Sequence, residues 1–134
     1  MNKGDKMHAT RTVCIDFDGT IVTQVEMNKE IIPDYVGDLK PGAAEIIRKL
    51  KKNGITIIIM SGRVHPHWHR VDEQTKLIES FLKENNIPFD GLISKHPTAA
   101  IFIDDKSLFD EDWDIIECEI ERRLKINLHA FNRR

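Results

Sequence analysis

The chain has 134 residues, of which 40% are hydrophobic and 31% are charged, enough for one globular domain with a single core. Its 20 basic and 22 acidic residues give a formal net charge of -2, so nothing indicates general affinity for nucleic acids or membranes. The two cysteines lie far apart and no apolar run approaches the ~20 residues of a membrane span, which excludes a disulfide framework, a cysteine zinc site and a transmembrane helix.

Residues 1–10 are largely polar, and we expect a flexible lead-in there. A single domain is expected to follow over residues 11–134. No apolar secretion segment comes after the first residues, so we expect a soluble protein located in the cytoplasm.

Short apolar runs alternate with amphipathic segments along the rest of the chain. The apolar runs predict buried strands, and they cover residues 12–15, 55–60, 91–94 and 99–103. Apolar side chains at helical spacing predict helices, over residues 41–53, 71–84 and 113–124. The mixed segment 22–40 predicts a loop or short hairpin that projects from the body. This alternation predicts an α/β fold, with a Rossmann-like parallel sheet sandwiched by helices.

Polar side chains follow the predicted strands at the point where each strand ends. Ligands bind outside the carboxyl ends of the strands in such sheets, so these groups form a candidate site. Asp16 and Asp18 end the first strand at alternate positions, and two converging carboxylates repel unless a cation lies between them. The other strand ends carry Ser61, Lys95 and the pair Asp104-Asp105.

In this order, the strand ends resemble the motifs of the haloacid dehalogenase superfamily of phosphohydrolases. The segment DFDGT is similar to the first motif of that superfamily, Ser61 after IIIM to the second, and Lys95 to the third. Asp104-Asp105 after IFI is similar to the acidic fourth motif, and the block LKPGAAEIIRKLKKNGITIIIMSGR is typical of the region around the second. The resemblance covers the chain from about Val13 to about Ile120.

The resemblance implies a Mg²⁺-dependent phosphatase that hydrolyses a phosphomonoester through an aspartyl-phosphate intermediate. Asp16 would be the nucleophile. Asp18 would protonate the leaving oxygen and then activate the water that hydrolyses the intermediate. Lys95 would balance the charge of the carboxylates and of the transferring group. Lysine in this motif is usually followed directly by proline, whereas His96 intervenes here, so the chain departs from the common pattern at this point.

The same resemblance implies which groups bind the phosphate and the metal ion. Ser61, Gly62 and Arg63 would contact the phosphoryl group of the substrate. Mg²⁺ prefers oxygen ligands, and these would come from the carboxylate of Asp16, the backbone carbonyl of Asp18, and one or both of Asp104 and Asp105.

Three of these assignments have a purely structural alternative. Ser61 is also a residue type that caps a strand end or turn. Lys95 is also compatible with a solvated loop position, where most lysines lie. Arg63 is equally able to pair with a surface acid.

Cap domains of this superfamily are inserted between the first and second motifs or between the second and third. Here the predicted loop and one helix fill the interval from Thr20 to Ser61, and one helix and a short strand fill that from Ser61 to Lys95. We therefore expect a core without a cap. An open site suits a large substrate, or a small one if a neighbouring subunit of a homo-oligomer covers it. The residues do not choose between a sugar phosphate, a nucleotide and the phosphate end of a macromolecule.

The segment His65-Pro66-His67-Trp68-His69 has two functional readings. Imidazole is a good zinc ligand, but alternate histidines share one side only if the segment is extended, and a fourth ligand is missing. A substrate-facing loop is the favoured reading, in which Trp68 offers a surface to an apolar or planar group. A solvated loop without function is the third alternative.

Two other classes of protein are compatible with part of this pattern. A receiver domain also combines acidic residues, a phosphorylated aspartate and a lysine on a parallel sheet, but its phosphoacceptor would end a middle strand, where this chain has Ser61. A non-catalytic binding module on the same fold would have lost catalytic residues, and the motif positions are all filled here.

Overall fold

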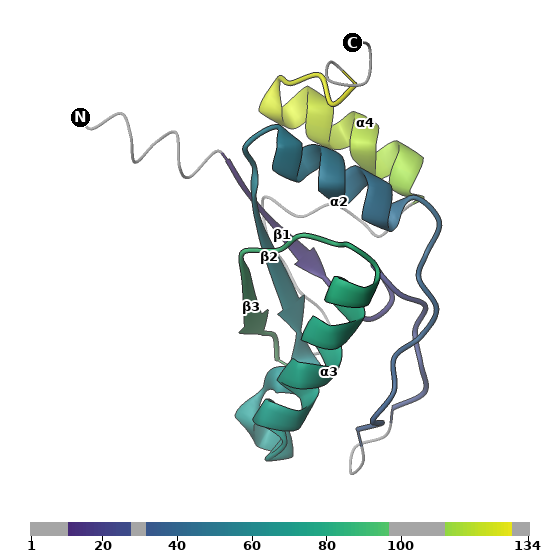
Figure 1. Ribbon diagram of the computed structural model, residues 1–134, viewed down its shortest axis with the longest axis vertical. Helices are drawn as coiled ribbons and strands as arrows, with labels where there is room; N and C mark the ends of the chain where they lie inside the picture. Colours follow the sequence, from purple (N-terminus) through teal and green to yellow (C-terminus); the bar gives the residue numbers. More distant parts are fainter. Residues whose placement is uncertain (1–10, 28–31, 97–111, 130–134) are drawn as a thin grey trace, which may run out of the picture.

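The computed structural model describes residues 11–27, 32–96 and 112–129. Within these ranges the strands form one parallel sheet in the order β1-β2-β3, with β1 at Thr12–Asp16, β2 at Thr56–Ser61 and β3 at Gly91–Ser94. All three strands therefore end at the same edge of the sheet (Figure 1). The run expected to form a strand over residues 99–103 lies outside the described residues.

Helices and short 3-10 turns connect these strands, at α2 (Ala43–Lys52), η1 (Gly62–Val64), η2 (Pro66–Trp68) and α3 (Val71–Glu84), and α4 (Trp113–Leu124) comes after β3 in the chain. The alternation of strands and helices confirms the predicted α/β fold. The hairpin segment and α2 fill the interval between β1 and β2, and η1, η2 and α3 fill that between β2 and β3. This arrangement agrees with a core that carries no cap.

The α2 helix begins two residues later than the sequence predicts. Gly42 precedes it with a left-handed backbone (φ 86°), a conformation that glycine adopts without steric cost. A Cβ atom at Gly42 would lie 3.1 Å from the Cβ of Trp113. The missing side chain therefore lets the first turn of α4 approach the first turn of α2, and the two helices lie side by side in Figure 1.

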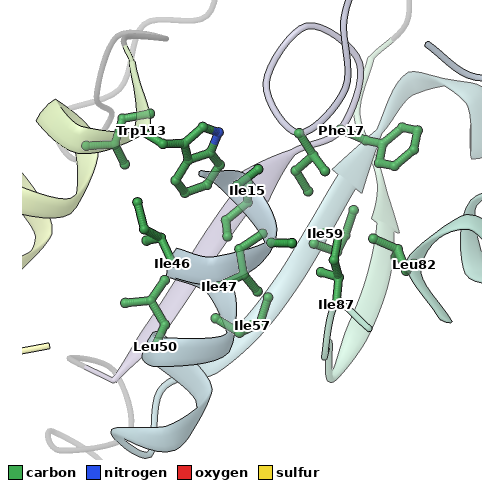
Figure 2. Close-up of a cluster of buried hydrophobic side chains, with 14 of the residues drawn as sticks. Ile15, Phe17, Ile46, Ile47, Leu50, Ile57, Ile59, Leu82, Ile87 and Trp113 are labelled. Carbon is green, nitrogen blue, oxygen red and sulfur yellow. The ribbon is translucent and has the colours of Figure 1, made fainter. Parts of the chain in front are cut away.

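The core forms where the apolar stripes of the helices meet one face of the sheet. In β2 the side chains of Ile57 and Ile59 are fully buried, and α2 and α3 cover this face with Ile47 and Leu82 among others (Figure 2). Cys14, which lies on the opposite face of the described sheet, is exposed. Each buried branched side chain contributes roughly 1.5–3 kcal/mol of transfer free energy, so this face fixes the register of the strands.

The segment after β1 confirms the expected hairpin. Val22 pairs with Leu39 in an antiparallel bridge, the N–H of Thr23 donates to the carbonyl of Asp38 (2.8 Å), and the N–H of Lys40 donates to that of Ile21 (2.9 Å). Figure 1 shows the two arms side by side, away from the sheet. The arms are residues 20–27 and 32–40, and the tip between them lies outside the described residues.

None of the helices in residues 11–27, 32–96 and 112–129 is long and apolar enough to cross a bilayer.

Candidate active site

The carboxyl edge of the sheet brings together side chains that are far apart in the sequence. β1 ends at Asp16, β2 ends at Ser61, and Lys95 follows β3 directly. The backbone N–H of Lys95 donates to the carbonyl of Ser61 (3.1 Å), and the Lys95 ammonium lies 3.3 Å from a carboxylate oxygen of Asp16. The parallel strands thus place a carboxylate, a hydroxyl and an ammonium group within one small region.

The carboxylate of Asp16 is in an environment that disfavours its ionised form. Partial burial raises the pKa of Asp16 above its usual value, and the nearby Asp18 carboxylate raises it further, while the ammonium of Lys95 acts in the opposite direction. A divalent cation bound to the Asp16 carboxylate would offset this penalty, because it favours the ionised form. The donor set at this edge, carboxylate and carbonyl oxygens, is the one that Mg²⁺ prefers.

The metal ligands expected from the sequence are only partly within the described structure. Asp104 and Asp105 lie outside the described residues. Within the described ranges, no group of three or more His, Cys, Asp or Glu side chains is arranged to hold a metal ion. Of the oxygen ligands expected for Mg²⁺, the described residues therefore include those of Asp16 and Asp18.

Asp18 lies in a tight turn that leaves the sheet directly after β1. The N–H of Phe17 continues the sheet by donating to the carbonyl of Met60 (2.9 Å), and the N–H of Gly19 donates to the carbonyl of Val22 (2.8 Å). The ammonium of Lys40 donates to the carbonyl of Gly19. Lys40 thus holds the turn from the second arm of the hairpin, a contact that sequence reasoning missed.

Arg63 is buried, and its guanidinium faces Asp18. Its Nε donates to both carboxylate oxygens of Asp18 (3.1 and 2.9 Å), and its Nη2 donates to one of them (3.0 Å). Its Nη1 donates to the carbonyl of Pro33 (3.1 Å) and to the side-chain oxygen of Gln74 (3.2 Å). Arg63 therefore pairs with an acid, but this acid is Asp18 of the candidate site and not a surface residue. Gln74 was not identified from the sequence, where it is one polar residue among several on a helix.

Ser61 caps a turn in a way that leaves its hydroxyl able to donate a further hydrogen bond. Its hydroxyl oxygen is buried and accepts a hydrogen bond from the backbone N–H of Arg63 (3.1 Å), which caps the turn η1 that Gly62 begins. A hydroxyl that accepts one hydrogen bond still has a hydrogen to donate. The cap fixes the position of the oxygen, so the structural role and a phosphate-binding role are compatible.

The histidine segment is folded into a helical turn. Pro66 begins η2, and the Nδ1 atom of His65 accepts a hydrogen bond from the backbone N–H of His67 (3.0 Å). The extended conformation that a zinc site would require is therefore not formed. The readings as a substrate-facing loop and as a solvated loop without function both remain.

A cavity of about 550 Å³ lies away from this edge, at the ends of α2 and α3. It is lined by basic side chains from the last turns of both helices, including Lys51, Lys52 and Lys83. Cations are favourable at helix C-termini because they compensate the helix dipole. These residues thus have a structural role, and the cavity is separate from the site.

Comparisons with known proteins agree with the fold and the motifs. A crystal structure of a structural-genomics target from Vibrio cholerae superimposes with a TM-score of 0.61, at 18% sequence identity, over 86% of this chain and 97% of that one; at this identity the likeness concerns the fold alone. No curated protein matches the chain. The family profile described as haloacid dehalogenase-like hydrolase matches residues 13–129. The protein therefore belongs to the haloacid dehalogenase-like hydrolases, as its motifs predict.

Proposed function

We propose that this hydrolase is a Mg²⁺-dependent phosphatase that cleaves phosphomonoesters through an aspartyl-phosphate on Asp16. The observation that carries the proposal is the pairing of the Asp16 carboxylate with the Lys95 ammonium at 3.3 Å, at the carboxyl edge of the sheet. Ligands of α/β proteins bind at this edge. The ammonium compensates charge on one side of the carboxylate, which leaves the nucleophile beside a cationic group suited to an incoming phosphoryl group.

Mg²⁺ would be held by the Asp16 carboxylate, the backbone carbonyl of Asp18, and Asp104 or Asp105. When bound, it supplies positive charge that shields the phosphoryl oxygens from the attacking carboxylate. Burial raises the pKa of Asp16, and a bound cation would offset this cost of the ionised carboxylate, which supports the assignment.

In the first step a carboxylate oxygen of Asp16 bonds to phosphorus and the bond from phosphorus to the leaving oxygen breaks. Asp18 in its acid form gives its proton to that oxygen. In the second step a water attacks the same phosphorus, Asp18 as a carboxylate takes the proton of the water, and the bond from phosphorus to Asp16 breaks. Inorganic phosphate leaves and Asp16 is regenerated.

Ser61 and Lys95 would bind the phosphoryl oxygens during both steps. Arg63, which was expected to do the same, has its guanidinium occupied by Asp18, Pro33 and Gln74. We therefore assign Arg63 a positioning role: it fixes the orientation of the Asp18 carboxylate. Its backbone N–H also fixes the hydroxyl of Ser61.

The test is phosphate release from a broad panel of phosphomonoesters, measured with Mg²⁺ and with EDTA. The panel includes sugar phosphates, nucleotides and 5′- and 3′-phosphorylated oligonucleotides, because the substrate class is open. We expect release that requires Mg²⁺ and disappears in Asp16→Asn. Asp114→Asn is the matched control, since this carboxylate is exposed on α4, and it should keep full activity.

Acid quenching during turnover should trap a phosphorylated peptide that contains Asp16. Full activity of Asp16→Asn would exclude this residue as the nucleophile, and activity that survives EDTA would exclude the metal ion. A wild-type protein that releases phosphate from no member of the panel would favour the non-catalytic binding module. The receiver alternative is not favoured by any observation, because β2, the middle strand of the described sheet, ends in Ser61.

A further inference from the structure

Four planar rings form a row next to the proposed active site, and we call this row the ring cluster: His65, His67, Trp68 and His96. The ring centroids of His65 and His96 are 5.7 Å apart, and those of His65 and His67 are 6.4 Å apart. The rings of His67 and Trp68 follow at 5.0 Å, nearly perpendicular to each other. Residues from two separate connections thus build one continuous surface.

The ring cluster is attached to the strand ends that carry the proposed catalytic groups. His65 directly follows η1, which Ser61 caps, and His96 directly follows Lys95. Ser61 and Ser94 are partners in the sheet, so the two connections start side by side. Figure 1 shows the teal turns between β2 and α3 beyond the ends of β2 and β3. A phosphate held at Asp16 and Lys95 would therefore lie at the same edge of the sheet as the two connections that carry the ring cluster.

A local hydrogen bond fixes the ring of His65. Because Nδ1 of His65 accepts from the N–H of His67 (3.0 Å), the hydrogen of the neutral imidazole is on Nε2. Pro66 begins η2 and His69 ends it with a left-handed backbone (φ 57°). The indole N–H of Trp68 is buried and has no hydrogen-bond partner within the described residues, although buried indole groups usually have one.

The ring cluster does not stabilise the core and does not form a metal site. His67 and His96 are exposed, whereas the core lies under α2 and α3. The described residues contain no group of three or more His, Cys, Asp or Glu side chains arranged to hold a metal ion. What remains is a set of contacting planar rings, of which those of His67 and His96 are exposed and those of His65 and Trp68 are partly buried.

We propose that the ring cluster binds the leaving group of the substrate and selects phosphomonoesters whose leaving group carries a planar aromatic ring. Nucleoside monophosphates and aryl phosphates share this chemistry, while glycerol and sugar phosphates lack it. A ring stacked on one of these side chains gains roughly 0.5–1.5 kcal/mol, which corresponds to about 2-fold to 10-fold in kcat/KM. This inference rests on the proposed phosphatase function and names its substrate class.

The experiment compares kcat/KM for a nucleoside 5′-monophosphate, phenyl phosphate, glycerol 3-phosphate and glucose 6-phosphate. The readout is the ratio of ring-bearing to ring-free substrates, and the two ring-bearing arms distinguish a nucleobase from an aryl group. His96→Ala and His67→Ala should each lower the ratio several-fold, by up to about 10-fold. His96→Phe should restore most of it because it keeps a planar ring. His69→Asn, in the same segment but outside the cluster, should leave the ratio unchanged.

A second measurement is independent of turnover. Titration with the nucleoside monophosphate should quench the fluorescence of Trp68, and inorganic phosphate should not; the signal should be absent in Trp68→Phe. If the protein hydrolyses phosphomonoesters but shows neither a ring preference nor this quenching, the inference is wrong and the phosphatase function stands. If it quenches but releases no phosphate, the ring site stands and the phosphatase function fails.

Discussion

The buried Arg63 and the partly buried Asp18 form a bidentate ion pair that joins the end of β2 to the turn after β1. The Nε–Oδ2 and Nη2–Oδ1 distances are 2.9 and 3.0 Å, and the side chains are 1% and 13% exposed. Two forked contacts between planar groups fix orientation as well as distance. The pair thus positions the carboxylate that we propose as acid and base, and the Nη1 contact to Pro33 ties it to the hairpin.

Removal of one partner of this pair should be costly. We expect Arg63→Ala to lower the free energy of unfolding by about 3–5 kcal/mol, because Asp18 would remain as a buried and uncompensated charge. Urea denaturation monitored by circular dichroism measures this change. Arg70→Ala is a control of the same residue type, which loses an exposed pair with Glu73 and a hydrogen bond to the carbonyl of Ile32, and it should cost far less than Arg63→Ala.

Arg63→Lys separates orientation from charge. A lysine keeps the positive charge but cannot form the fork, so we expect a folded protein with reduced kcat and a KM close to that of the wild type. A loss of less than 1 kcal/mol in Arg63→Ala, or wild-type kcat in Arg63→Lys, would contradict the positioning role.

The strands, the helices and half of the site follow from the sequence for simple reasons. Apolar residues at regular spacing bury one face of each element, as Ile57 and Ile59 do, so the pattern reflects the packing. Parallel strands end at one edge, so Asp16, Ser61 and Lys95 had to meet once the sheet was predicted. No detailed geometry was needed for either prediction.

The partner of Arg63 could not be obtained in this way. An arginine after a strand reaches several acids, and which one it meets depends on the path of the turn that carries Asp18 and on the arm that carries Pro33. Neither path has a periodic signal in the sequence. The same holds for the rings of His65 and His96, which come together because two irregular connections start from neighbouring strands.

The raised pKa of Asp16 predicts a stability that depends on pH and on metal. Since burial raises its pKa in the folded state, folding favours the protonated form, and this contribution is present in acid and is lost as pH rises through the raised pKa. In EDTA at neutral pH, Asp16→Asn should therefore be more stable than the wild type. The difference should shrink as pH falls towards the ordinary value of 3.8.

Thermal unfolding at several pH values checks this sign. Addition of Mg²⁺ should stabilise the wild type and leave Asp16→Asn nearly unchanged, because the metal binds the ionised carboxylate. An asparagine variant less stable than the wild type at neutral pH in EDTA would contradict the electrostatic account.

Asp90 should show the opposite pH dependence. The hydrogen bond from Lys51 lowers the pKa of Asp90, and a second one from the backbone N–H of Ile57 (2.8 Å) acts in the same direction. The stability it contributes is present above its ordinary pKa of 3.8 and is lost as pH falls through the lower folded value. We expect Asp90→Ala to cost about 1 kcal/mol at neutral pH, and much less near pH 2 if the protein is still folded there.

Urea denaturation at neutral and acidic pH measures the change in the free energy of unfolding that Asp90→Ala causes at each pH. Glu26→Ala removes an exposed carboxylate from the hairpin and should be neutral at either pH. An equal cost of Asp90→Ala at both pH values would show that the side chain stabilises the fold by packing and not by its charge.

Gly37 lies where the two arms of the hairpin are in closest contact. A Cβ atom there would lie 2.1 Å from the carbonyl oxygen of Thr23 and 2.6 Å from its hydroxyl oxygen. Gly37→Ala should therefore force the arms apart and break the hydrogen bonds between Thr23 and Asp38, at a cost of about 1–3 kcal/mol. Because the second arm also carries the Pro33 carbonyl that holds Arg63, kcat should fall as well.

Two further variants identify the cause of this loss. Thr23→Ala removes the hydroxyl but keeps the backbone carbonyl, so Thr23→Ala combined with Gly37→Ala should not restore stability. Tyr35→Ala changes an exposed side chain on the same arm (56% exposed) and should leave kcat unchanged. Amide exchange at Thr23 reports the separation directly, since its N–H is protected only while it donates to Asp38. Slow exchange at Thr23 in Gly37→Ala would mean that the arms tolerate the methyl group, and the link from the hairpin through Pro33 to Arg63 would then have to be tested at Pro33 itself.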